Sequence, residues 1–88
     1  MMATIAELID DVASTLGHWM PADALVDHVV DRFGVNRRSV QRMVSRMIAD
    51  GRLLVRRGWA TQQGATGKPI TVPIREVRAV RVMWETVR

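Results

Sequence analysis

The residues of this sequence best suited to bind a ligand lie between positions 37 and 46, where arginine, serine and glutamine recur at helical spacing. At about 3.6 residues per turn, Val40, Met43, Val44, Met47 and Ile48 gather on one side of a helix. The opposite side carries Arg37, Arg38, Gln41, Arg42, Ser45 and Arg46. Arginine and glutamine can each bond a nucleobase edge at two points, and arginine also binds phosphate oxygens. The pattern predicts a helix that buries one face and presents nucleic-acid-binding groups on the other, although an ordinary solvated face would have similar spacing.

Local signals predict three helices, over residues 4–16, 21–33 and 36–50. Thr4 and Glu7 have the spacing of a capping box, in which the side chains satisfy free backbone N–H groups of the first turn. Pro21 suits the first turn of the second helix, where its missing N–H costs nothing. Asn36 is an N-cap for the third helix, the one that carries the arginines. These elements predict that two helices support the third.

After residue 52 the pattern changes from helical to strand-like, and a hairpin is predicted. Its strands are expected over 53–61 and 69–75, joined by the turn-rich loop 62–68. A tighter hairpin that turns at Arg57 and Gly58 is the alternative. Pro73 indicates an edge position, because proline has no N–H for a neighbouring strand. Trp59 is expected in the core.

The last segment, residues 76–88, fits two patterns. Val77, Val80, Trp84 and Val87 have helical spacing, whereas Val80, Val82 and Trp84 also alternate as in a strand. We expect a helix from about Glu76. The predicted fold class is therefore α+β: a domain over 1–75, with three helices and a hairpin, and a helical C-terminal extension over 76–88 that packs on the domain or forms a homodimer.

Charge is divided unevenly along the chain. Residues 1–31 hold six acids and no lysine or arginine, whereas residues 32–88 hold thirteen bases and three acids, so the two parts carry −6 and +10. This asymmetry is typical of nucleic-acid binding, and a solvated surface with chance clustering is the alternative.

Several classes of function find no support in the composition. There is no cysteine, two histidines are too few for a metal site, and no paired carboxylates or nucleophile motif suggests an enzyme. No apolar run approaches the length of a membrane span, and the N-terminus does not look like a signal peptide. We therefore expect a cytoplasmic protein without catalytic residues, metal or cofactor.

The stretch from Asp31 to Arg57 resembles the DNA-binding core of GntR-type and DeoR-type bacterial regulators. The matching residues are Phe33, Gly34, Val35, Arg38, Val40, Arg42, Gly51, Leu53, Leu54, Arg56 and Arg57. The resemblance covers about residues 20–57. Asn36 departs from the usual Ser or Thr but caps equally well, and residues 65–69, ATGKP, are similar to the wing tips of many winged-helix regulators.

This resemblance implies a small winged helix, a three-helix bundle with a β-hairpin wing, in which the third helix enters the DNA major groove. Base contacts are expected from Arg37, Arg38, Gln41 and Arg42, and phosphate contacts from Ser39, Ser45 and Arg46. The wing residues Arg56, Arg57 and Lys68 would follow the backbone or enter the minor groove. The implied function is sequence-specific binding of double-stranded DNA by a small transcriptional regulator, such as a repressor, or a phage-type control protein. The alternative is a winged-helix module that binds protein partners instead.

Overall fold

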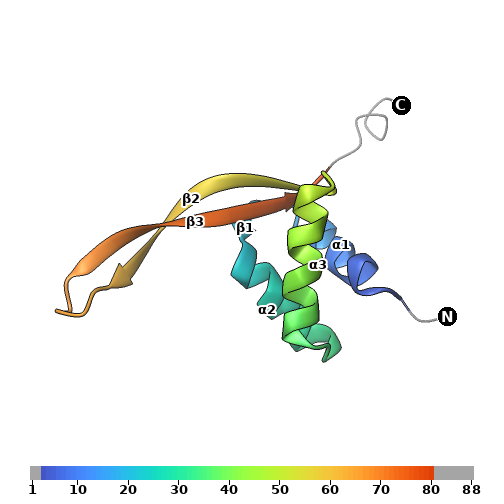
Figure 1. The fold of residues 1–88 in the computed structure, drawn as a ribbon, viewed down its shortest axis with the longest axis horizontal. Helices are drawn as coiled ribbons and strands as arrows, with labels where there is room; N and C mark the ends of the chain where they lie inside the picture. The colour runs from blue at the N-terminus through green and yellow to red at the C-terminus, as the bar shows by residue number, and fades with distance from the viewer. Residues whose placement is uncertain (1–2, 81–88) are drawn as a thin grey trace.

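A computed structural model describes residues 3–80 of the chain, which form three helices and a three-stranded antiparallel sheet. The helices lie together at one end of the molecule, and a long hairpin extends away from them (Figure 1). The α+β class is thus confirmed, and the arrangement is compatible with a winged helix.

Helix α1 (Ile5–Leu16) begins one residue later than predicted, with Thr4 as its N-cap, and ends at the predicted residue. The N–H of Glu7 donates to Oγ1 of Thr4 over 3.2 Å, so the N-cap half of the predicted capping box is present. The helix ends at Gly17, whose φ of 64° lies in the left-handed region that favours glycine.

Helix α2 (Ala22–Phe33) starts one residue later than predicted. Pro21 does not lie in its first turn but precedes it in extended conformation, and with Met20 it forms the two-residue strand β1 (Met20–Pro21). In that strand Pro21 lies opposite Glu76. The fixed φ of proline fits a strand end as well as a helix start, so the residue type alone could not separate the two positions.

Helix α3 (Arg37–Ala49) follows a short turn at Gly34, whose φ is 65°. The side chain of Asn36 caps it by accepting a hydrogen bond from the N–H of Ser39 over 3.1 Å. Val35, in the turn, is half-buried against the core. The predicted cap and the predicted extent of this helix are both confirmed.

The hydrophobic core lies between the three helices and one face of the sheet. Its largest fully buried side chains are Ile9, Leu25, Val29, Val40, Val44, Met47 and Val77. No buried residue among those described is charged or polar. The apolar sides of α1, α2 and α3 therefore face inward together, which turns the arginine-bearing side of α3 to solvent.

The sheet has the strand order β1-β3-β2, and its main part is the hairpin formed by β2 (Leu53–Gln63) and β3 (Pro69–Ala79). This is the longer of the two predicted hairpins. Strand β3 continues past residue 75 to Ala79, so the helix expected from Glu76 is wrong at its start: Val77 is needed in the sheet, where it is fully buried. The remainder of that expectation, residues 81–88, lies outside the described residues.

The two prolines of β3 both point their ring nitrogens away from β2. The N–H of Gly64 donates to the carbonyl of Lys68 over 2.8 Å, and the same register pairs every residue of β2 with β3. Even-numbered residues therefore exchange hydrogen bonds across the hairpin, while odd-numbered ones, including Pro69 and Pro73, direct their backbone outward. Since β1 pairs only with residues 76 and 77, Pro73 lies on a free edge, as predicted.

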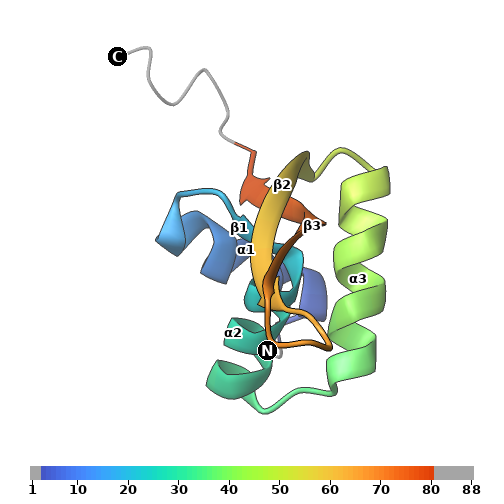
Figure 2. The same cartoon turned by 90° about the vertical axis from the view of Figure 1, so that its left-hand side faces the viewer.

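The outer part of the hairpin, residues 59–73, contains no buried residue and is called the arm here. Figure 1 shows it projecting beyond the helices as a twisted two-stranded ribbon, and Figure 2 views the hairpin from its tip. The molecule measures 51 × 32 × 21 Å along its principal axes. Trp59 stands on this arm with 63% of its surface exposed, so the expectation that it belongs to the core is wrong. It belongs to residues 59–73, none of which is buried, so the core does not extend over this part of the hairpin.

Candidate nucleic-acid interface

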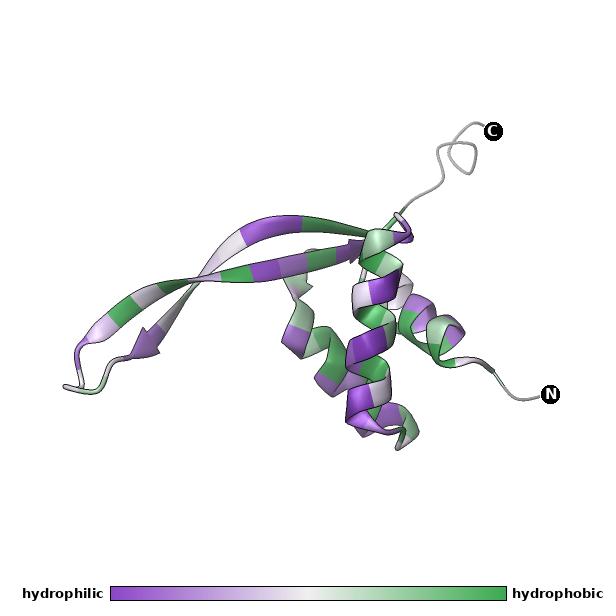
Figure 3. Ribbon diagram, viewed as in Figure 1, coloured by the Kyte–Doolittle hydropathy of each residue, from purple (hydrophilic) through white to green (hydrophobic). Residues whose placement is uncertain are grey.

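The solvent-facing side of α3 carries a row of exposed cations. Arg38, Arg42 and Arg46 follow one another at four-residue spacing and are all exposed, as are Gln41 and Ser45 beside them. Within residues 3–80, none of these three arginines forms an ion pair. The predicted site residues of α3 are thus brought together on one accessible surface, which Figure 3 shows as hydrophilic bands along this helix.

A shallow depression runs beside this row, between α3 and the beginning of α1. Ile5, Met43 and Ser39 line it together with Arg42 and Arg46. Apolar side chains and two arginines share this lining, which would suit a sugar–phosphate backbone, since its phosphates are charged and its sugars are less polar.

Two of the predicted α3 residues have structural contacts as well. Arg37 forms a 2.6 Å ion pair with Asp27 of α2, which turns it toward that helix. Ser39 belongs to the N-cap of α3: its N–H, and its hydroxyl at 3.5 Å, approach Oδ1 of Asn36. Both residues help fix the start of α3, so their side chains are less available to a ligand than those of Arg38 and Arg42.

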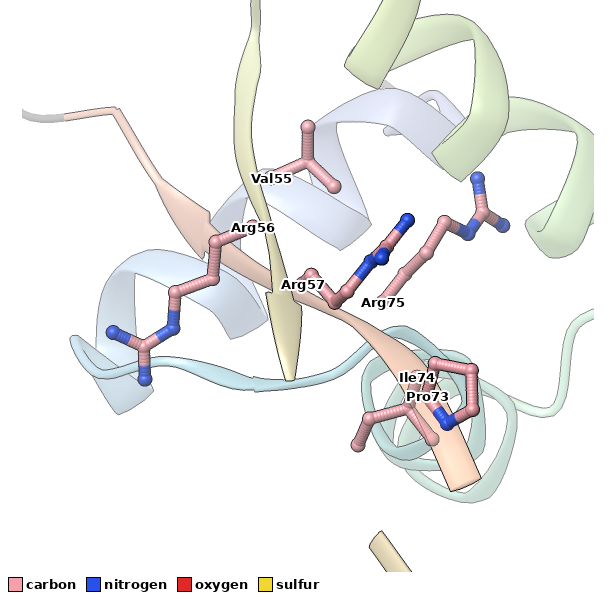
Figure 4. Close-up of a pocket in the computed structure, with 6 residues that line it drawn as sticks. All are labelled: Val55, Arg56, Arg57, Pro73, Ile74 and Arg75. Carbon is pink, nitrogen blue, oxygen red and sulfur yellow. The ribbon is translucent and has the colours of Figure 1, made fainter. Parts of the chain in front are cut away.

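The hairpin presents two different faces because side chains alternate along each strand. Odd-numbered residues point to the helix side of the sheet, where Leu53, Val77 and Ala79 are buried. Arg57 and Arg75 lie directly opposite each other on this same face, toward the hairpin tip from these buried residues. Figure 4 shows the two guanidinium groups extending in one direction from the two strands, over a shallow pocket also lined by Val55 and Pro73.

A cross-strand pair of like charges is unfavourable for the hairpin itself. Neither Arg57 nor Arg75 has an acidic partner among the described residues. An anion placed between the two guanidinium groups would remove this repulsion, which makes the pair a candidate phosphate contact.

Arg56, which precedes Arg57 in the chain, points to the opposite face (Figure 4). Its Nε donates to Oε1 of Glu76 over 2.9 Å, and its guanidinium group lies 4.4 Å from the ring centre of Trp19. These contacts hold the β1 segment against the hairpin. Arg56 was predicted to bind DNA with Arg57, but the structure separates the two residues and gives Arg56 a structural position.

Lys68 lies at the tip of the hairpin, where its carbonyl closes the turn with Gly64. Gly67 provides the left-handed residue of that turn, with φ 82°. Lys68 is exposed and far along the arm from Arg57, so it could reach only a separate part of a long ligand.

The acidic side chains predicted for the first third of the chain lie on other surfaces. Those of α1 and α2 are all exposed: Glu7, Asp10, Asp11, Asp23, Asp27 and Asp31. In the hairpin, the single acid is Glu76, which shares the face of Arg56. The helix-side face of the hairpin therefore carries positive charge only, as does the exposed side of α3.

Arg75 is the member of this surface that the sequence analysis missed. The predicted loop over 62–68 would have placed Pro73 opposite Arg57, and the shorter observed turn shifts the register so that Arg75 takes that place. Within the described part of the chain, no cluster of acidic or histidine side chains could hold a metal ion, and no helix has the length and apolarity needed to cross a membrane. Comparisons with protein-family models, with curated proteins and with solved structures found no match.

Proposed function

We propose that this chain is a winged helix-turn-helix protein that binds double-stranded DNA sequence-specifically and acts by occupying its site, as a small transcriptional regulator or a phage-type control protein does. The observation that carries the proposal is the row of Arg38, Arg42 and Arg46 on the exposed side of α3, without acidic partners in the described part of the chain. Such a row is repulsive in the free protein and is stabilised by a polyanion.

In this proposal α3 lies in the major groove, which is wide enough to admit one helix. Arg38 and Arg42, near the beginning of α3, with Gln41 beside them, contact base edges, while Ser45 and Arg46 contact phosphates. Arg57 and Arg75 are on the same side of the sheet as the helices, so a duplex held by α3 can be bound by the hairpin too.

The test is to replace Arg38 and Arg42 together by alanine and to measure DNA binding by fluorescence anisotropy. The duplexes are those enriched from genome fragments by the unmodified protein at physiological salt. Each bidentate base contact is worth about 1–3 kcal/mol of discrimination, so we expect the double variant to lose the preference for the enriched duplex over a scrambled one. The thermal unfolding midpoint should stay nearly unchanged, since both side chains are exposed.

A matched control removes the same charge elsewhere. Arg32 and Arg52 are exposed and lie outside α3, so the variant with both replaced by alanine should keep the sequence preference. Unchanged preference in the Arg38/Arg42 variant, or an equal loss in the control, would contradict the proposed role of α3.

The second candidate function is a protein-binding module, favoured by the exposed apolar residues Leu54 and Ile70 on the other face of the hairpin. Salt separates the two functions. Binding through several phosphates weakens steeply as salt increases, because counterions are released from DNA, whereas binding through Leu54 and Ile70 would change little.

A further inference from the structure

Trp59 is the most exposed large hydrophobic side chain among residues 3–80, at 63%. It lies at the start of the arm, opposite Pro73 on β3. Single exposed apolar residues need no explanation, but this one is a tryptophan, whose large flat side chain is held on a paired strand. Its surroundings indicate what could cover it.

On the face that carries Trp59, the neighbouring side chains toward the helices are cationic, and those toward the hairpin tip carry hydroxyl groups. The neighbouring cross-strand pair toward the helices is Arg57–Arg75, and the next pair toward the tip is Thr61–Thr71. The one acid of the hairpin, Glu76, is on the opposite face. The ligand that suits this face therefore combines negative charge with a flat or apolar surface.

A nucleotide has both properties, because its phosphate is anionic and its base offers a π-face to an aromatic side chain. We propose that Trp59 is a wedge that packs on a base step of the DNA duplex bound by α3, while Arg57 and Arg75 hold the adjacent phosphates. The inference rests on the proposed function, since it assumes that the same duplex lies along α3. It adds a contact that deforms DNA: apolar wedges partly unstack a base step and bend the duplex.

The wedge gives the protein a preference that does not depend on hydrogen bonds to base edges. Pyrimidine–purine steps such as TA and CA unstack more easily than others. A duplex with such a step under the arm should therefore be bound more tightly than one without it, even when the part contacted by α3 is the same.

The experiment compares the full-length protein with Trp59→Ala and with Ile70→Ala. Ile70 is the matched control because it is also exposed on the arm, at 46%, but on the opposite face. Each protein is titrated against a duplex of about 30 base pairs, three helical turns, that contains the site enriched by the unmodified protein. Anisotropy gives the affinity, and energy transfer between dyes at the two duplex ends gives the bend.

We expect Trp59→Ala to weaken binding about tenfold, within the range measured for loss of one aromatic–base contact, and to reduce the bend. Ile70→Ala should change neither quantity. Trp59→Phe should recover part of the affinity because a smaller aromatic ring remains, and DNA should quench the tryptophan fluorescence of this variant less than that of the unmodified protein, which we expect to be quenched. Circular dichroism checks that each variant is folded.

The outcomes separate this inference from the proposed function. If the unmodified protein binds no duplex at low salt, the proposed function and the wedge both fail. If it binds and bends DNA equally well without Trp59, only the wedge is overturned. The competing occupant is a second copy of the chain, whose exposed acids on α1 and α2 could face Arg57 and Arg75. A concentration-dependent dimer in sedimentation that Trp59→Ala abolishes, with DNA affinity unchanged, would assign Trp59 to that contact instead.

Discussion

The two ends of the hairpin are built from the same strands in the same register, but they have different roles. At its base, Leu53, Val77 and Ala79 are buried against the helices. Along the arm, residues 59–73 have no second layer of structure, and pairing between the two strands is the main interaction that holds them. An isolated two-stranded hairpin is at best marginally stable in water, so the base must stabilise the arm. The base thus supports the fold, while the arm is free to present side chains to a ligand.

The largest effect on stability is expected from shortening a buried valine at the base of the hairpin. Val77→Ala should destabilise the protein by about 2 kcal/mol, because Val77 is fully buried between the sheet and the helices. Val72→Ala, the same change on the arm, should cost about 0.5 kcal/mol or less. Urea unfolding followed by circular dichroism measures both. Equal losses would show that the arm contributes to the stability of the fold as much as the base does.

A smaller effect should separate the two faces of the hairpin at neighbouring positions. Arg56→Ala should reduce the free energy of unfolding by about 1 kcal/mol, since it removes the Glu76 ion pair and the contact with Trp19. Arg57→Ala should leave stability unchanged or slightly higher, but it should weaken DNA binding and reduce the salt slope by about 1. DNA titrations at several salt concentrations measure the affinity and its salt slope, and unfolding measures stability. If both variants lost stability equally, or lost DNA affinity equally, the different roles of the two arginines would be contradicted.

Gly58 lies at the boundary between the base of the hairpin and the arm, and replacing it should change stability by about as much as Arg56→Ala or less. A β-carbon built there would lie 2.5 Å from Cδ of Glu76, so Gly58→Ala must displace that side chain from Arg56. We expect a loss of about 1 kcal/mol in the unmodified protein. In a Glu76→Ala background the same change should instead stabilise by about 0.5 kcal/mol, because alanine restricts the unfolded chain. A double-mutant cycle measures the coupling free energy between positions 58 and 76. Additive changes in the free energy of unfolding would show that the two positions do not interact.

The smallest effect is expected from shortening the arm. Ala60 and Val72 form a hydrogen-bonded pair, which a two-residue Asn-Gly turn can close. A chain with residues 61–71 replaced by this turn should unfold cooperatively within about 4 °C of the full-length protein. Its DNA affinity should decrease only by the contribution of Lys68. Loss of cooperative unfolding would show that the tip is needed for folding.

The helices of this protein could be predicted from its sequence because their signals are local. Thr4, Asn36 and the terminal glycines mark the ends, and the apolar period gives the buried sides. Strand β1 could not be predicted, since two residues carry no period. The apolar residues after residue 75 fitted both a helix and a strand. Residues 76–79 form a strand because Val77 is buried in the sheet, which is a tertiary effect that the local pattern does not contain.

The candidate site could be predicted on α3 but only in part on the hairpin. A loop over 62–68 would have brought residue 61 opposite 69, and Arg57 opposite Pro73. In the structure the turn is shorter, the pairs shift by two residues, and Arg57 meets Arg75. The exposure of Trp59 depends on where the helices end beneath the sheet, which alternation along a single strand does not reveal.

The prolines of β3 also limit how this molecule can associate with copies of itself. Growth of a fibre by strand addition requires two open edges on each sheet, so that every added copy offers a new one. Here Pro69 and Pro73 interrupt the outer backbone of β3, and β1 is only two residues long and covers residues 76 and 77, so β2 has the longest uninterrupted edge of the described sheet. An edge of this kind can pair with its own copy about a twofold axis, so at high concentration we expect the long exposed hairpin to favour a closed pair over a filament.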